Sequence, residues 1–300
     1  MPEGWIVRAL SGYYDVSPGL QMTETVRCRA RGIFKKKGIT PLVGDRVVYG
    51  VTSTGEGTVD EIFPRTSELV RPPIANVELA VLVMSVAEPA PGWQLLDKLL
   101  VHTERAGIAS IICLTKCDLS PGETDRAAAD VREMASVYES MGYPVLMTSA
   151  KHGDGIELLR ERLAGKISVF AGQSGVGKSS LLNALVPHLN LATGQISEKL
   201  GRGRHTTRHV ELIPLGNGGV VADSPGFSQL DFAGMEKEEL GRYFADFRAY
   251  APECKFTGCL HRREPGCRVV AALEEGRIAR SRYEHYLQFL EELTDRKRRY

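Results

Sequence analysis

Short runs in which apolar and polar residues alternate, separated by glycines, fill the first 68 residues of the chain. Alternation with a period of two is typical of strands that bury one face, and several such strands at close spacing indicate a small barrel. The first domain, residues 1–68, is therefore predicted to be an all-β, OB-like barrel. Its expected strands are residues 5–10, 25–33, 44–49 and 57–62.

One of these strands has a strongly basic face. In residues 26–31, apolar side chains alternate with Arg27, Arg29 and Arg31, which places the three arginines together on one side of the strand. No acidic partner for them is evident in the sequence. The arginine face is interpreted as a surface for RNA phosphates, and the alternative is an ordinary solvated outer face. Cys28, on the opposite side, is expected in the barrel core.

The pattern changes after Pro72 and Pro73, which exclude helix and donate nothing to a strand ladder. A domain boundary is expected at residues 65–73. Beyond it, nearly continuous apolar runs alternate with amphipathic segments, which predicts a parallel α/β sheet covered by helices on both faces. This second domain spans residues 69–229. Its expected strands are residues 79–84, 109–114, 144–147 and 167–170, and its expected helices are residues 95–106, 123–141 and 156–163.

A glycine-rich loop follows the last of these strands and precedes a helical segment, residues 180–185. Its spacing, GxxxxGK[ST], lets backbone N–H groups turn inward around a triphosphate at a helix N-terminus. Lys178 would reach the β- and γ-phosphates as a catalytic cation, and Ser179 would offer its hydroxyl to Mg²⁺. Because both flanks fit, a chance glycine turn is the weaker interpretation. The expected nucleotide-binding residues here are Gly172, Gln173, Ser174, Gly175, Val176, Gly177, Lys178, Ser179 and Ser180.

Two further loops follow buried strands, where the ligand loops of such a sheet lie. The first contains Thr115, Lys116 and Asp118, and the second contains Ser149 and Ala150. An aspartate carboxylate can accept from guanine N1–H and N2–H₂ together, which adenine cannot supply, while a lysine stem covers the base and a backbone N–H donates to O6. These loops predict a guanine site. The alternative is a turn in which the aspartate only caps a helix.

The segment after the phosphate loop supplies candidates for Mg²⁺ and for the γ-phosphate. Residues 201–207 are glycine-rich, basic and without periodicity, as expected of a mobile segment, and a hairpin is predicted at residues 209–222. Asp223, at the end of that hairpin, can hold Mg²⁺ through water, and Gly226 can offer its backbone N–H to the γ-phosphate as part of the catalytic site. Thr206 or Thr207 would complete the Mg²⁺ shell with Ser179 and Asp223. A helix cap and a solvated loop are the plainer alternatives.

Residues 230–300 form the third predicted domain, a helical one with a metal site. Cys254, Cys259, His261 and Cys267 lie within fourteen residues. Three thiolates and one imidazole satisfy tetrahedral Zn²⁺ and leave no open position, so the site is expected to be structural. Reduced cysteines on a loop beside a solvated histidine are the alternative. The expected helices are residues 236–247, 269–273 and 283–293.

Composition adds limits on partners and compartment. The net charge of +1 conceals basic clusters at residues 27–37, 202–208 and 296–299, which allow a polyanionic partner. Lys255, Arg262 and Arg263 beside the predicted metal site fit either an RNA contact or a charged rim, and residues 295–299 fit either an rRNA contact or a solvated tail. No targeting segment and no apolar run of 18 residues occurs, so a cytoplasmic protein is expected.

The order of the motifs is itself informative. Small GTPases usually run phosphate loop, threonine segment, DxxG, NKxD and SA, whereas this chain starts with TKxD and SA and ends with DxxG. The G domain is therefore predicted to be circularly permuted. With a barrel before it and a Cys/His segment after it, the chain resembles the ribosome small-subunit-dependent GTPase A family (RsgA, also called YjeQ or YloQ). The resemblance covers essentially the whole chain, including residues 172–179, 203–210 and 223–227 and the cysteine cluster.

The resemblance implies a GTPase that binds the 30S ribosomal subunit and hydrolyses GTP late in the maturation of that subunit, with ribosome-stimulated activity. It implies GTP or GDP, Mg²⁺ and one structural Zn²⁺ as ligands, and the 30S subunit with its 16S rRNA as partner. We expect a monomer, with neither DNA nor a membrane among its partners.

Two residues depart from the usual GTPase pattern. Thr115 stands where GTPases commonly have Asn, and Phe227 stands where Ras-like proteins have the glutamine that orients water. Phenylalanine cannot orient water by a hydrogen bond, so hydrolysis by the chain alone is expected to be slow. His205, directly before Thr206, is the candidate for the missing catalytic group. Its alternative role is a contact with rRNA.

Two other functions fit parts of the sequence. An RNA-binding assembly scaffold would use GTP as a structural or switching ligand with incidental hydrolysis, and turnover that rises with 30S subunits argues against it. A P-loop kinase of small molecules leaves the TKxD and SA motifs without a task, and no lid is evident. The chain is also expected to pass from Gly226 directly into the zinc domain, so that loss of the γ-phosphate pulls on that domain.

Overall fold

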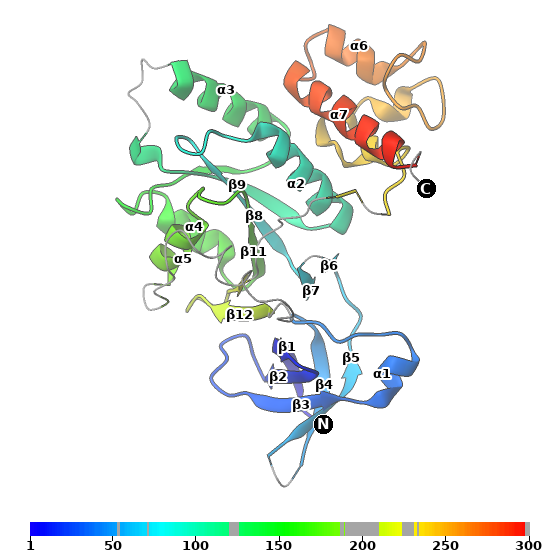
Figure 1. Ribbon diagram of the computed structural model, residues 1–300. Helices are drawn as coiled ribbons and strands as arrows, with labels where there is room; N and C mark the ends of the chain where they lie inside the picture. The colour runs from blue at the N-terminus through cyan, green and yellow to red at the C-terminus, as the bar shows by residue number, and fades with distance from the viewer. Residues whose placement is uncertain are drawn as a thin grey trace.

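The computed structural model describes residues 1–52, 55–70, 72–119, 126–186, 189, 210–223, 231–232 and 234–297. Figure 1 shows three parts in a row: a barrel of strands at one end, an α/β sheet with helices in the middle, and a helical region around α7 at the other end. In this part of the chain, no helix combines the length and apolar character needed to cross a bilayer.

The N-terminal part is a closed five-stranded barrel. In the order β1-β2-β3-β5-β4, the last strand pairs back with the first, and β3 and β5 form the one parallel pair of the barrel among the described strands. The OB-like barrel predicted from the alternating pattern is therefore confirmed, and Cys28 is fully buried in its core. The strands are β1 (Glu3–Leu10), β2 (Tyr13–Ser17), β3 (Val26–Ala30), β4 (Arg46–Val51) and β5 (Gly57–Ile62).

The strand predicted at residues 25–33 is too long. β3 ends at Ala30, and a short helix, α1 (Gly32–Lys36), follows at once. The helix turns Phe34 inward, where it is buried against the barrel core, while its neighbours stay exposed. Burial of one aromatic ring therefore ends the strand earlier than the alternating pattern indicates.

The middle part is the predicted α/β sheet. Its order is β10-β9-β8-β11-β13-β12, with parallel pairing except for the β12–β13 hairpin, which confirms the hairpin predicted at residues 209–222. Helices α2 and α3 pack on one face, where the apolar core is continuous with that of the barrel, and α4 and α5 pack on the other face against a separate core. The strands are β8 (Leu79–Ser85), β9 (Ala109–Thr115), β10 (Val145–Met147), β11 (Ile167–Ala171), β12 (Val210–Pro214) and β13 (Val220–Asp223). The helices are α2 (Trp93–Ala106), α3 (Arg126–Ser140), α4 (Ile156–Leu163) and α5 (Lys178–Leu185), with a 3-10 turn, η1 (Cys117–Leu119).

The barrel and the α/β sheet are continuous. The end of β1 pairs antiparallel with β12, with Arg8 opposite Glu211 and Ala9 opposite Val210, so that eleven strands form one hydrogen-bonded sheet. A small hairpin of β6 (Glu68–Val70) and β7 (Pro73–Ala75) lies where the domain boundary is expected, and leads into β8. Nothing in the local sequence pattern indicates the pairing of β1 with β12.

The C-terminal part is helical, with an aromatic core that includes Phe244, Phe247, Tyr286 and Phe289. It contains η2 (Leu240–Tyr243), η3 (Ala245–Phe247), η4 (Ala251–Glu253), α6 (Arg268–Glu274) and α7 (Arg280–Lys297). The predicted helix at 236–247 is wrong, because Phe244 has an extended backbone that separates two short 3-10 turns. This break lets both phenylalanines reach the same core. The two later helices are confirmed and are longer than predicted.

Candidate nucleotide and metal sites

The phosphate loop lies between β11 and α5, at the carboxyl edge of the parallel strands. Its glycines allow the loop to pass close to the sheet: a Cβ on Gly172 would lie 2.2 Å from the carbonyl oxygen of Val83 in β8. Gly175 and Gly177 have positive φ values of 82° and 99°, which favour glycine. Val176 is buried and anchors the loop, whereas residues 173–175 are exposed. The loop is thus open to a ligand on one side and fixed on the other.

Lys178 begins α5 and folds back over the loop. Its ammonium group donates to the carbonyl oxygens of Gly172 at 2.8 Å and Gln173 at 2.7 Å. Desolvation lowers the pKa of Lys178 to about 8. Ser179 and Ser180 follow in the first turn of α5 and are half-buried. The loop therefore holds a cation over its own concave backbone, at the place expected for the terminal phosphates.

Two residues of the TKxD motif connect its loop to the phosphate loop. The Thr115 hydroxyl, which is buried at the end of β9, donates to the carbonyl oxygen of Val176 and lies 3.2 Å from that of Met84. The Lys116 ammonium donates to the carbonyl oxygen of Gly175 at 2.8 Å. Thr115 thus lies behind the phosphate loop, where it fixes one loop against the other.

The Asp118 carboxylate is held by the second loop. Ser149 Oγ donates to Asp118 Oδ1 at 2.7 Å, and this hydrogen bond is the main reason that the pKa of Asp118 is lowered. The Ser149 backbone N–H donates to the Asp154 carbonyl at 3.0 Å and is therefore already used. The Ala150 N–H has no recorded acceptor among the described residues, which makes it the available donor for guanine O6. The carboxylate and this donor lie in the loops that follow the adjacent strands β9 and β10.

The remaining nucleotide candidates are only partly within the described chain. His205, Thr206, Thr207 and Gly226 lie outside the described residues. Asp223 ends β13, which runs parallel to β11 with Ala222 opposite Val169. The backbone of Asp223 therefore lies beside the strand that leads into the phosphate loop.

The predicted metal residues converge. The ligand atoms of Cys254, Cys259, His261 and Cys267 all lie within 4.8 Å of one another. His261 Nδ1 lies 3.6 Å from Cys254 Sγ and 3.5 Å from Cys267 Sγ, and these two sulfurs are 3.9 Å apart. Donor atoms around a tetrahedral zinc ion lie roughly 3.5 to 3.8 Å apart, given Zn–S and Zn–N bonds near 2.3 and 2.0 Å. The donor set therefore fits Zn²⁺, with His261 binding through Nδ1.

Groups around the cluster support the same donor set. The backbone N–H groups of Arg268 and Val270 donate to the sulfurs of Cys254 and Cys267, each at 3.4 Å. Burial raises the pKa of Cys267 and lowers that of His261, as expected for a cluster whose anionic thiolates need a cation.

No local sequence pattern indicates the role of Gly241, which lies against the histidine of this cluster. A Cβ on Gly241 would lie 3.0 Å from His261 Cδ2 and 3.1 Å from Nε2, so glycine lets the imidazole lie flat against η2. Glu264 is a second residue whose role no local pattern indicates. Its carboxylate accepts from the backbone N–H groups of Leu260, Arg262 and Arg263 and shapes the loop that carries the histidine.

The arginine face of the barrel has acidic partners. Arg27 Nε lies 3.5 Å from Asp15 Oδ1, and Arg31 Nε lies 2.6 Å from Asp60 Oδ1. Arg29 stacks on a tyrosine of β2, 4.6 Å from the ring centroid. The prediction that these arginines lack acidic partners is wrong for two of the three, because the strands on either side of β3 bring carboxylates from distant parts of the sequence.

A group of three lysines lies at the end of the short helix of the barrel. Lys35, Lys36 and Lys37, at the end of α1, are exposed and have no recorded acidic partner among the described residues. Two apolar side chains beside them, Ile33 and Ile39, are about half exposed. In the described part of the barrel, the charge of this lysine patch (Lys35–Lys37) is free to meet a polyanion.

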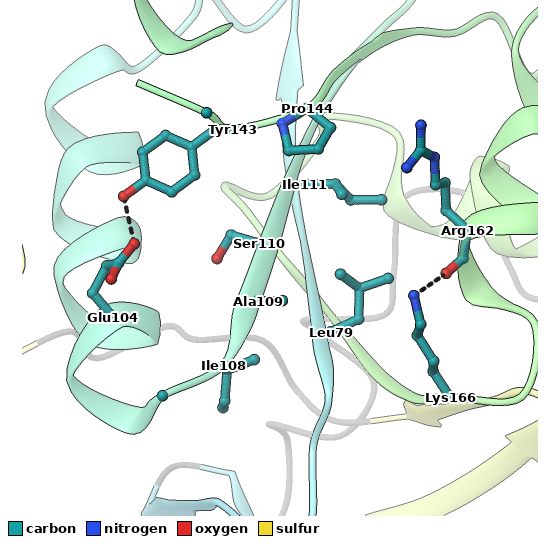
Figure 2. A pocket seen from close by; sticks show the side chains of 12 residues that line it. Leu79, Glu104, Ile108, Ala109, Ser110, Ile111, Tyr143, Pro144, Arg162 and Lys166 are labelled. Carbon is teal, nitrogen blue, oxygen red and sulfur yellow. Dashed lines mark hydrogen bonds between the residues drawn. The ribbon is translucent and has the colours of Figure 1, made fainter. Parts of the chain in front are cut away.

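A cavity of about 510 Å³ lies at the opposite edge of the α/β sheet from the phosphate loop. Figure 2 shows it between Tyr143 and Glu104 on one side and Arg162 and Lys166 on the other, with the first residues of β9 between them. The Tyr143 hydroxyl donates to Glu104 at 2.7 Å. The cavity lies at the amino ends of the strands, whereas nucleotides bind at the carboxyl ends, so the cavity is not part of the nucleotide site.

Comparisons with known proteins agree with this architecture. A family model described as the RsgA GTPase matches residues 62–233, and one described as the RsgA N-terminal domain matches residues 3–59. Two relatives named small ribosomal subunit biogenesis GTPase RsgA, from Bacillus pumilus (strain SAFR-032) and Bacillus subtilis (strain 168), are 55% and 51% identical over 301 residues, with all of each chain covered.

Solved structures give the same result. YloQ, described as a circularly permuted GTPase, is 46% identical with a TM-score of 0.82, over 99% of this chain and 96% of that one. YjeQ from Thermotoga maritima is 38% identical with a TM-score of 0.85, over 98% of each chain. The predicted permuted G domain is thereby confirmed, with GTP or GDP and Mg²⁺ as its ligands and a cluster able to hold a structural zinc. The chain belongs to the RsgA family of GTPases and is a GTP hydrolase.

Proposed function

We propose that this GTPase binds the small (30S) ribosomal subunit and hydrolyses GTP during the late maturation of that subunit. The observation that carries the proposal is that its similarity to ribosome biogenesis GTPases covers the barrel and the metal-binding part as well as the G domain. The partner implied by those relatives can therefore act on the same surfaces here. The proposal places the protein in the cytoplasm, as a monomer, with 16S rRNA rather than DNA as its nucleic-acid partner.

The nucleotide would be bound by the phosphate loop and by the two loops that follow β9 and β10. The backbone N–H groups of the phosphate loop and the Lys178 ammonium would hold the phosphates, with anionic oxygens replacing the carbonyls of Gly172 and Gln173 as acceptors. Asp118, held by Ser149, would accept from the guanine N1–H and N2–H₂ groups. Ser179, Asp223 and either Thr206 or Thr207 are the proposed Mg²⁺ ligands. The ion would neutralise charge between the β- and γ-phosphates.

The attack of water would depend on a group that this chain lacks at the usual position. Phe227 cannot orient water, so we propose that His205 does so when the ribosomal subunit fixes the segment that carries it, with Gly226 donating its N–H to the γ-phosphate. Hydrolysis would then follow correct docking. Single-turnover hydrolysis by His205→Ala at saturating 30S subunits separates this role from an rRNA contact, which would lower affinity and leave the saturated rate unchanged.

Guanine selection can be tested at one carboxylate. Asp118→Asn removes the acceptor for two guanine donors and is expected to reduce the preference for GTP over XTP by about 3 kcal/mol. Thermal stability provides the control for folding. A variant that still prefers GTP to the same degree would exclude this loop as the guanine site.

The partner can be tested by sedimentation. Full-length protein is mixed with purified 30S or 50S subunits and with GDP or a non-hydrolysable GTP analogue, then pelleted through sucrose. We expect co-sedimentation with 30S subunits, stronger with the analogue than with GDP. Replacement of the lysine patch (Lys35–Lys37) by serine should weaken that binding, while GTP affinity stays unchanged. It should also reduce the slope of the logarithm of the binding constant against the logarithm of the salt concentration by up to about three. Equal binding to both subunits would contradict the proposal.

A further inference from the structure

A second cavity, of about 450 Å³, opens beside the cysteine and histidine cluster. Cys254, Cys259 and His261 line it, together with Gly241. Because the four ligand atoms lie within 4.8 Å of one another, an ion that they enclose occupies only the inner end of this space. The remaining volume falls within the range of pockets that hold small ligands. A structural ion alone therefore does not account for the cavity.

The rim of this cavity combines an exposed aromatic ring with a free cation. Phe256 is 45% exposed, although an aromatic ring of its size is usually buried. The Lys255 ammonium lies 5.5 Å from the centroid of that ring. Arg242, also on the rim, is exposed and has no recorded acidic partner among the described residues. The lining of this cavity thus includes both a π surface and a planar guanidinium.

The carboxylates near the rim are engaged elsewhere. Glu264 accepts from three backbone N–H groups of its own loop, and Glu253 lies 3.5 Å from Arg268. Glu238, on the rim, lies 3.8 Å from Lys237. Arg262 and Arg263 are exposed and, in the described part of the chain, have no recorded ion pair. The surface around the opening is therefore cationic, which suits an anionic ligand.

We infer that this cavity binds one unpaired nucleotide of single-stranded RNA, with its base against Phe256 and its phosphate on Arg242. The inference rests on the proposed function, which makes ribosomal RNA a partner. Bases outside a helix expose their faces for stacking on aromatic side chains, and such stacking is the main source of affinity for single strands. A guanidinium can pair with phosphate oxygens in a bidentate way. An acidic peptide could pair with the cations, but its recognition would not require an aromatic ring beside a cavity large enough for a base.

The test uses the zinc-loaded full-length chain and a short fluorescently labelled RNA without secondary structure. Phe256→Leu keeps an apolar side chain but removes the aromatic face, and should weaken binding roughly ten-fold or more. Phe256→Trp should retain affinity, and its added indole emission should be quenched by the RNA beyond any change in the wild type, which contains Trp5 and Trp93. Arg242→Met should reduce the salt slope by about 0.7.

Matched controls separate the cavity from other surfaces. Leu158 on α4, which is 44% exposed, is a control for loss of an exposed apolar side chain, and Leu158→Ala should bind RNA normally. Zinc content is measured for each variant. The inference would be overturned if Phe256→Leu bound the RNA as tightly as the wild type, or if the RNA did not quench the indole of Phe256→Trp. It would also be overturned if polyglutamate displaced the RNA and the affinity for RNA fell equally in Phe256→Leu and Leu158→Ala. If wild-type turnover does not respond to 30S subunits, the proposed function fails, whereas the RNA measurements at Phe256 still decide the cavity.

Discussion

The G domain joins its two neighbours in opposite ways. Its junction with the zinc-binding part is a buried network of charges: the Arg282 side chain is 2% exposed and the Asp97 side chain is fully buried, and they form an ion pair. Arg282 also pairs with Asp246 at 3.0 Å, and His285 Nδ1 lies 2.6 Å from the second oxygen of Asp97. Tyr138 of α3 completes the network by donating to Asp97 at 2.8 Å.

The junction with the barrel has no such network among the described residues. It includes the short pairing of β1 with β12 and an exposed ion pair, Arg8–Glu211, at 3.9 Å. A bridge between Val43 and Ile74 and an apolar core shared by the barrel and the sheet add uncharged contacts. β12 begins at Val210, immediately after the segment that carries the threonine candidates. A change in that segment can therefore reach the barrel through one pair of strands.

The difference indicates which junction is rigid. Separating buried charges leaves them unpaired at a cost of several kcal/mol, whereas an exposed ion pair contributes about 1 kcal/mol or less. We expect the zinc-binding part to move together with α2, and the barrel to be the part that changes position with the nucleotide. This differs from the expectation, drawn from the chain order alone, that loss of the γ-phosphate pulls on the zinc domain.

The largest effect is expected from loss of a metal ligand, because it should disrupt the fold of the zinc-binding part. Cys259→Ser should abolish stoichiometric zinc and loosen the helices around α6 and α7, because ligand binding and folding of such a segment are coupled. Elemental analysis should find one zinc per wild-type chain, and hydrogen exchange should show lost protection in α6 and α7 of the variant. Wild-type protein without zinc, purified in the absence of chelators, would contradict the assignment.

The next effect compares the two junctions directly. Arg282→Met leaves Asp97 and Asp246 buried without their partner and should lower the free energy of unfolding by about 3–5 kcal/mol. Glu211→Gln, at the barrel junction, should lower it by less than about 1 kcal/mol. Urea unfolding of both variants measures the difference. Similar losses in the two variants would remove the distinction between a rigid and a separable junction.

A smaller, pH-dependent effect comes from His102, which stacks on Phe232 at the rigid junction, 5.4 Å between ring centroids. Burial, with Lys98 and Arg105 nearby, lowers the pKa of His102 to about 4. In the unfolded chain, this histidine has its ordinary pKa near 6.5, so between about pH 6.5 and 4 the unfolded state binds more protons than the folded state. The free energy of unfolding should therefore fall as the pH drops from about 6.5 to 4, by up to about 3 kcal/mol. His102→Gln should flatten this part of the stability curve, and an unchanged curve would show that His102 does not contribute.

The smallest expected signal lies at the barrel junction in the intact protein. Amide hydrogen exchange of residues 8–9 and 210–211 should differ between the GDP form and the form with a non-hydrolysable GTP analogue, because these strands adjoin the threonine segment. Amides in α2 and α7 should exchange at the same rate in both forms. The reverse pattern would assign the nucleotide response to the zinc-binding part.

The sequence predicts those features whose residues lie close together along the chain. The phosphate loop, the TKxD loop and the cysteine cluster each depend on local spacing, and the barrel and the α/β sheet follow from short periodic segments. Arg282 and Asp97 are 185 positions apart, and β1 pairs with β12 through Arg8 and Glu211, which are even further apart in the sequence. Such partners leave no trace in local periodicity.

Local patterns also fail where a tertiary contact outweighs them. The segment 236–247 has helical spacing, yet an extended residue at Phe244 lets two phenylalanines share one aromatic core. The arginines of β3 alternate as a free basic face would, yet Asp15 and Asp60 approach them from neighbouring strands. In both cases, the deciding neighbour comes from another element.

The central claim is that this chain is a GTPase whose hydrolysis is tied to the small ribosomal subunit. Steady-state turnover of GTP and of ATP, each with no subunits, with 30S subunits and with 50S subunits, tests it most directly. We predict slow turnover of GTP by the protein alone, a large increase with 30S subunits, little change with 50S subunits, and negligible turnover of ATP throughout. GTP turnover that is the same in all three conditions, or ATP turnover that matches it, would contradict the account.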